Sequence, residues 1–130
     1  MQIIDDTLLN RISEEAAGNE RLRKNFNLHS SLDDKVQRLL NALEPGTILP
    51  VHRHQHTDET YFIVRGKLNV KFYDDNKLLI EEVELNPVNG KYGISIPAGK
   101  WHTVDVKEKG TVIFEVKEGP YLAMNKEDIL

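Results

Sequence analysis

The feature that most constrains this chain is a set of histidines and one glutamate at short, regular intervals. His52 and His54 are two residues apart, and Glu59 follows five residues after His54. Residues i and i+2 of a β-strand point to the same face, so the two imidazoles face one direction. The polar run 55–58 can turn the chain so that Glu59 begins the next strand beside them. The spacing therefore predicts neighbouring strands that meet at a shared site.

A third histidine, His102, follows a turn-forming stretch that contains Pro97 and Gly99. Three neutral imidazoles and one carboxylate are a ligand set suited to a divalent transition metal such as Zn, Fe, Mn, Ni or Co. A six-coordinate ion would keep two positions for water or a ligand. The sequence predicts one such ion per chain, with these metal ligands: His52, His54, Glu59 and His102.

Short strands separated by turns account for most of the chain after Pro50. Leu68, Val70 and Phe72 alternate with polar residues, which is the period-two pattern of a half-buried strand. Residues 74–77 have the composition of a hairpin turn. Regular short strands of this kind predict a mainly β protein, a sandwich or a barrel. The expected strands are 59–64, 68–73, 78–85, 94–96, 101–106 and 111–117.

The N-terminal part has the pattern of an amphipathic helix over residues 6–17. Asp6 or Thr7 is the expected N-cap, and Gly18 with the following asparagine is the expected stop. The apolar stripe should pack on the barrel, and it comprises Leu8, Leu9, Ile12 and Ala16. The preceding Ile3 and Ile4 are expected to pack there too.

Residues 31–43 carry conflicting signals. Ser31 to Asp34 resembles a capping box, and the leucines that follow have helical spacing. A strand is instead needed to lead into Gly46. We favour a helical turn near residues 32–36 and a strand from about Arg38 to Glu44. Residues 21–29 are polar and are expected to be irregular.

The histidine spacing, together with the flanking glycines, resembles the cupin family. The first cupin signature, G-x5-H-x-H-x4-E-x6-G, is matched in full between Gly46 and Gly66. The second is matched only at its centre, because Gly90 lies one residue too far upstream and Val106 replaces an asparagine. The resemblance implies a single-domain jelly-roll barrel, a double-stranded β-helix, that holds one metal ion by the four residues named above.

The flanks narrow the resemblance to cupin-fold metalloproteins of the WbuC type. Residues 27–29, 36–46 and 114–121 carry this likeness, which covers roughly residues 20–121. Members of that family occur with bacterial surface-polysaccharide genes, which implies a sugar-related role. The expected organisation is an N-terminal helical extension over 1–30, a cupin barrel over 31–121 and a C-terminal tail over 122–130.

Composition excludes several partner classes. The chain has 130 residues, 17 Lys+Arg against 21 Asp+Glu, and no cysteine. Because charges of both signs are scattered, neither nucleic acid nor a membrane surface is an expected partner. Disulfides and thiolate metal sites are excluded. The N-terminus lacks the pattern of a secretory signal, so we expect a cytoplasmic protein.

Three residues share the inward face set by the expected ligands and should line the cavity: Tyr61, Ile63 and Val104. Of these, Tyr61 is the candidate catalytic residue, as a hydrogen-bond donor or acid beside the metal. The ligand should be small and bind by chelation, as a sugar or a keto or hydroxy acid does.

Five further residues carry weaker signals. His56 is expected to face solvent, with a fifth-ligand or proton-shuttle role as the alternative. His29 should make local hydrogen bonds, with a cavity-lining role as the alternative. Glu115 is expected on an outward face. The alternative is that it acts as a general base near the metal. Arg53 should point away from the metal and form a salt bridge or bind an anion, while Trp101 should pack on the opposite face from His102.

Three function classes remain open from the sequence. The first is a metal-dependent isomerase, epimerase or lyase that acts on a sugar-derived metabolite. The second is an Fe(II)-dependent dioxygenase, and the third is a non-catalytic metal- or carbohydrate-binding module. A small barrel has sheet edges to cover, so we also expect a two-fold homodimer through a sheet face or edge.

Overall fold

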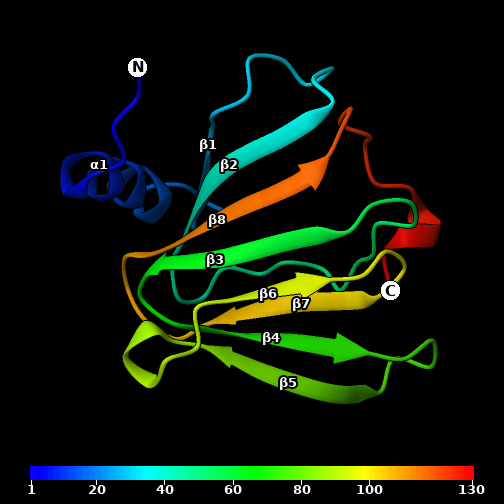
Figure 1. The fold of residues 1–130 in the computed structure, drawn as a ribbon. Coiled ribbons are helices and arrows are strands. Elements are labelled where there is room, and N and C mark those ends of the chain that lie inside the picture. Colours follow the sequence, from blue (N-terminus) through cyan, green and yellow to red (C-terminus); the bar gives the residue numbers. More distant parts are fainter.

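Two antiparallel sheets and one α-helix make up the computed structural model, which describes residues 1–130 (Figure 1). The five-stranded sheet has the order β1-β2-β8-β3-β6, and the three-stranded sheet has the order β5-β4-β7. The elements are α1 (Asp6–Ala17), β1 (Arg23–Asn27), β2 (Val36–Leu43), β3 (Glu59–Arg65), β4 (Leu68–Tyr73), β5 (Leu79–Leu85), the 3-10 turn η1 (Pro87–Asn89), β6 (Gly93–Ile96), β7 (Trp101–Val106), β8 (Thr111–Glu118) and the 3-10 turn η2 (Lys126–Asp128).

The main core lies between the inner faces of the two sheets. Strand β4 alternates buried and half-buried residues along its whole length, as its sequence predicts. The inward residues form one apolar cluster, comprising Leu43, Tyr61, Ile63, Leu68, Val70, Phe72, Leu85, Ile96, Val104, Val106 and Ile113. The predicted fold class, a mainly β jelly-roll barrel with a short N-terminal helix, is confirmed.

A second apolar cluster joins α1 to the outer face of the five-stranded sheet. Leu8, Leu9 and Ile12 are buried there against Leu40 of β2 and Val112 of β8. The helix bounds and the stop at Gly18 agree with the prediction.

Two details at the start of the helix differ from the prediction. The N-cap is Asp5, whose carboxylate accepts a hydrogen bond from the Leu8 backbone N–H at 3.0 Å. Ile3 and Ile4 are exposed, because they precede this cap and so extend beyond the helical stripe.

Strand β1 corrects the expectation that residues 21–29 are irregular. All five of its residues pair with β2, from Arg23 opposite Leu43 to Asn27 opposite Leu39. It is an edge strand with mostly polar, exposed side chains. An edge strand needs no apolar alternation and natural edges favour charged residues, so its sequence carries little strand signal.

Strand β2 resolves the conflict in residues 31–43 in favour of the strand. Leu39 and Leu43 lie on the inner side, whereas Leu40 and Ala42 lie under α1. A strand covered on both faces buries consecutive residues, and this produced the helix-like spacing of its leucines.

The C-terminal segment, residues 120–130, lies against the loop that carries His52 and His54. The backbone of Ile129 bridges to His52, and the Leu130 N–H donates to the Val51 carbonyl at 2.8 Å. Figure 1 shows the segment returning to the barrel end where β3 starts. The chain end thus forms part of the wall beside this loop. No helix is long and apolar enough to span a bilayer.

Candidate metal centre

The fold gathers His52, His54, Glu59 and His102 at one end of the barrel. One nitrogen or oxygen atom of each lies within 4.8 Å of the others. These four residues would hold a divalent ion between them, after small side-chain movements that bring the ligand atoms closer together. Glu59 and His102 are buried, whereas His52 and His54 are half-buried.

Backbone pairing fixes where these side chains start. His52 and His102 form an isolated antiparallel bridge, with N–H···O distances of 3.0 and 2.8 Å. Glu59 is the first residue of β3, and His102 is the second residue of β7. The loop between His52 and Glu59 therefore connects two anchored ends, which holds His54 over the barrel mouth.

Backbone carbonyls also orient two of the rings. His52 Nδ1 lies 2.9 Å from the Pro50 carbonyl, and His102 Nδ1 lies 2.9 Å from the Lys100 carbonyl. A carbonyl oxygen only accepts, so both Nδ1 atoms must carry a proton. The Nε2 atoms are then the ones left for ligation, which is the arrangement typical of metal-binding histidines.

One carboxylate oxygen, Glu59 Oε1, is the centre of the cluster. His102 Nε2 lies 2.9 Å from it, His54 Nε2 3.2 Å, and the Tyr61 hydroxyl donates to it at 3.2 Å. Burial alone would raise the pKa of the Glu59 carboxyl, but the contacts with His102 and His54 hold this pKa well below its usual range. The site therefore carries a fixed negative charge that favours a cation.

His52 is a neutral donor at physiological pH. Burial, and then the nearby His102 ring, lower the pKa of His52 to about 4. The centroids of these two rings are 4.4 Å apart. An imidazole that resists protonation keeps its lone pair for a metal, so the donor set fits a divalent transition ion.

Tyr61 faces the cluster from two residues further along β3. Its hydroxyl lies 3.4 Å from His102 Nε2 as well as contacting Glu59. Burial, followed by the negative charges of Glu59 and Glu115, raises the pKa of Tyr61 well above its usual range. Tyr61 is thus a neutral hydrogen-bond donor. Ile63 and Val104 face inward as predicted, but they are packed in the core.

Glu115 corrects the expectation of an outward side chain. It lies directly opposite Tyr61 in the β3–β8 pairing, so both point into the barrel, and it is buried. Asn41 Nδ2 donates to its Oε1 at 2.9 Å, while Asn41 Oδ1 is buried without a protein partner. Burial, and then the charge of Glu59, raise the pKa of Glu115. Alternation from Ile113 along β8 was the sequence signal that could have revealed this position.

Arg53 points away from the cluster, as predicted, and anchors the C-terminal segment. Its guanidinium lies 3.4 Å from Asp128 Oδ1 and 4.3 Å from the centroid of the Trp101 ring. Asp128 Oδ1 also accepts from Gln55 Nε2 at 2.6 Å. Trp101 is buried on the opposite side from His102, and its indole N–H donates to Asp75 at 2.8 Å.

The two remaining histidines lie outside the cluster. His56 is exposed on the loop, as predicted. His29 is buried and accepts the Arg38 backbone N–H through Nδ1 at 3.0 Å, which confirms the predicted local hydrogen bond.

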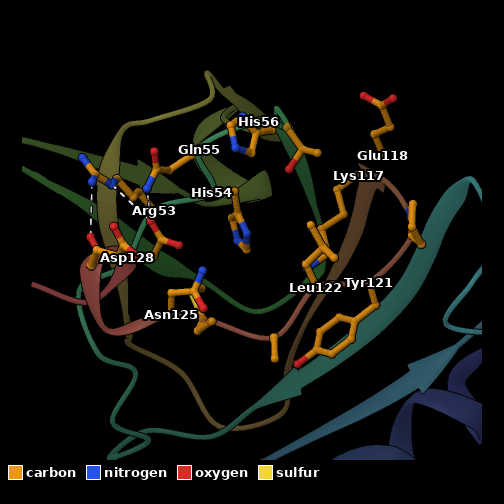
Figure 2. A pocket seen from close by; sticks show the side chains of 15 residues that line it. Arg53, His54, Gln55, His56, Lys117, Glu118, Tyr121, Leu122, Asn125 and Asp128 are labelled. Atoms are coloured by element: carbon orange, nitrogen blue, oxygen red, sulfur yellow. Dashed lines mark hydrogen bonds and ion pairs between the residues drawn. The ribbon is translucent and has the colours of Figure 1, made fainter.

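A cavity of about 360 Å³ opens beside the cluster (Figure 2). His54 reaches it from the cluster, Lys117 lines it from β8, and Tyr121 and Asn125 line it from the C-terminal segment. The cavity was expected to be lined by Tyr61, Ile63, Val104 and the four proposed ligands. Of these only His54 lines it, and the rest of its lining comes from the 53–57 loop, the end of β8 and the C-terminal segment. Sequence periodicity could not place the C-terminal segment there.

Comparison with protein families gives one match. Residues 4–85 match the model described as a domain of unknown function, DUF6016. The chain belongs to the DUF6016 family. Its match covers α1 and β1 to β5, and therefore includes three of the four clustered residues. No curated protein matches this DUF6016 chain.

Solved structures similar to this DUF6016 chain have the cupin fold. A cupin superfamily protein, DSY2733, from Desulfitobacterium hafniense is 22% identical with a TM-score of 0.56, over 77% of this chain and 79% of the other. The protein TT1209 from Thermus thermophilus is 24% identical with a TM-score of 0.64, over 91% and 97%. The capsular polysaccharide assembling protein CapF from Staphylococcus aureus is 20% identical with a TM-score of 0.64, over 86% of this chain but 32% of CapF. The TM-scores show a shared fold, and at these identities they show the fold alone.

Proposed function

We propose that this chain is a cupin metalloprotein that binds one divalent transition-metal ion through His52, His54, Glu59 and His102. The observation that carries the proposal is their convergence within 4.8 Å, on a buried carboxylate that carries a negative charge. The carbonyl contacts of His52 and His102 support it, since they direct both Nε2 atoms to ligation. When bound, such an ion supplies Lewis acidity towards a carbonyl or hydroxyl oxygen.

Tyr61 is the residue we propose for a role in binding or chemistry. Its neutral hydroxyl donates to Glu59 and lies 3.4 Å from His102, and it would turn this one O–H from Glu59 to an oxygen of a ligand seated at the cluster. Glu115 lies opposite it and is a second buried acid on the same inner face. Tyr61 would orient the ligand oxygen and provide its proton.

The proposed substrate is a small sugar, sugar derivative, or keto or hydroxy acid, and the proposed reaction class is isomerisation, epimerisation or elimination. Support comes from the WbuC-type motifs in the sequence and from the fold shared with CapF, which is a capsular polysaccharide assembling protein. We therefore propose a WbuC-type protein of polysaccharide metabolism, located in the cytoplasm.

Metal binding is tested by elemental analysis of protein stripped with a chelator and reloaded with one metal at a time. We expect about one ion per chain in the parent, and a severe loss in His52→Ala and in His102→Ala, because each removes one ligand. His56→Ala is the matched control, since His56 is exposed on the same loop. Unchanged metal content in both ligand variants would show that the ion is held elsewhere.

The reaction class is tested on the same metal-defined protein. Sugar nucleotides and sugar acids are incubated with the zinc, manganese and iron forms, and products are followed by mass spectrometry and NMR. An iron form that consumes O2 while the zinc form is inert would favour the dioxygenase alternative. Ligand-dependent stabilisation without any product would favour a binding module.

A further inference from the structure

Lys117 shares the inner face of the barrel with the proposed metal ligands. In the β3–β8 pairing it lies directly opposite Glu59, the carboxylate of the cluster. Directly opposed residues have Cβ atoms about 4.5–5.5 Å apart and project to the same side. Lys117 is half-buried, and it lines the same 360 Å³ cavity as His54. Figure 2 shows both side chains reaching into that space from different parts of the fold.

Lys117 forms no ion pair in the structure, in which ion pairs have N···O distances of 4.0 Å or less. The other basic side chain at the cavity, Arg53, is committed to Asp128 and stacks on Trp101. The neighbouring Glu118 also lines the cavity, but it is exposed, and Figure 2 shows its carboxylate pointing away from His54. Lys117 is therefore the available ammonium beside the cluster.

Lys117 is half-buried and makes no ion pair, so its ammonium is free to bind an anion in the cavity. The cavity is large enough for a small metabolite. Because Lys117 lies directly opposite Glu59, one small ligand can contact both the lysine and the cluster. An anionic group of a ligand would gain a charge-assisted hydrogen bond there. At the other end of the ligand, a metal ion held by the cluster would bind two neighbouring oxygens.

Resting on the metal site proposed above, we propose that Lys117 binds a distal anionic group of a small α-hydroxy or α-keto acid whose hydroxyl or keto oxygen and carboxylate bind the metal. The distal group is a carboxylate or a phosphate, since an ammonium binds both as a point charge. Lys117 thereby selects for ligands with two anionic ends over otherwise similar ligands with one.

Three ligands that share one chelating end test this selection. D-Glycerate has a neutral distal hydroxyl, D-malate has a distal carboxylate, and 3-phospho-D-glycerate has a distal phosphate. Binding to the zinc-loaded protein is measured by calorimetry, after the metal content of each sample has been determined. We expect the parent to bind malate or phosphoglycerate about 10- to 100-fold more tightly than glycerate, and the tighter of the two identifies the distal group.

Lys117→Gln should abolish this preference while leaving glycerate affinity within about twofold, and Lys117→Arg should keep most of it. Lys24→Gln is the control, because Lys24 is an exposed strand lysine on β1. A parent that holds its zinc but binds all three ligands equally would overturn the role of Lys117, even if Lys117→Gln does not fold. A parent that retains no zinc would instead refute the metal site itself.

Discussion

At the scale of single residues, the cluster depends on histidines that stay neutral. The sequence predicted which four side chains meet, because their spacing depends only on strand alternation and one turn. It did not predict that Glu115 and Lys117 complete the inner wall. Alternation from Ile113 along β8 indicates their inward direction, but local spacing does not reveal the pairing of β8 with β3, which places them opposite Tyr61 and Glu59.

The metal-free protein should lose stability as the pH falls from about 6.5 towards 4. The folded pKa of His52 is lowered to about 4, whereas an unfolded histidine titrates near 6.5. Between these values the unfolded chain binds more protons, so acid favours unfolding, and the contribution of His52 is complete only above pH 6.5. Urea unfolding across this pH range measures the effect.

His52→Gln should flatten the dependence on pH between 4 and 6.5, whereas the exposed-loop variant His56→Gln should leave it intact. If the stability of His52→Gln changes with pH as steeply as that of the parent, the protonation of His52 does not cause this pH dependence.

Tyr61→Phe should keep the fold and the metal but weaken ligand binding or turnover. The change removes a hydroxyl that donates to Glu59 Oε1 at 3.2 Å and retains the buried ring. Loss of a hydrogen bond to a charged group costs roughly 1.5–3 kcal/mol where it is not replaced. Metal content and malate binding, measured side by side, separate the two effects. If Tyr61→Phe binds a confirmed ligand as tightly as the parent does, Tyr61 has only a packing role in the barrel.

At the scale of elements, strands with a regular pattern were predictable and the others were not. Strand β4 alternates cleanly, so its bounds were correct, whereas β1 is polar and is a strand because β2 offers a free edge. The C-terminal segment has no repeat at all. It is held by contacts with residues more than 70 positions away in the chain, which local sequence cannot reveal.

Asp128→Ala should weaken metal binding about tenfold. Asp128 holds both Arg53 and Gln55, which flank His54 on the ligand loop. Without Asp128, Arg53 and Gln55 lose their side-chain contacts with it. Loss of a residue that positions metal ligands typically lowers metal affinity by about 10- to 100-fold. Glu127→Ala is the control, because Arg53 contacts only the backbone carbonyl of Glu127. Equal zinc affinity in both variants would mean that the segment covers the cavity without positioning the ligands.

At the scale of the whole molecule, the homodimer stays a prediction, as does the division of the chain at residues 30 and 121. Strand β5 is an edge of the three-stranded sheet and exposes Leu79 and Ile80. An apolar edge strand of this kind is normally covered. Light scattering at micromolar concentration should give twice the chain mass of 14.9 kDa. Ile80→Lys should give the single-chain mass, and a monomeric parent would refute the dimer.

Anomalous X-ray diffraction locates a bound metal and so shows whether the four side chains hold one transition-metal ion. Crystals of zinc-loaded protein are measured on both sides of the zinc absorption edge. We expect a single strong anomalous peak about 2.0–2.2 Å from His52 Nε2, His102 Nε2, a nitrogen of His54 and a carboxylate oxygen of Glu59. A zinc peak elsewhere in the molecule, or none at this cluster in crystals that contain stoichiometric zinc, would contradict it.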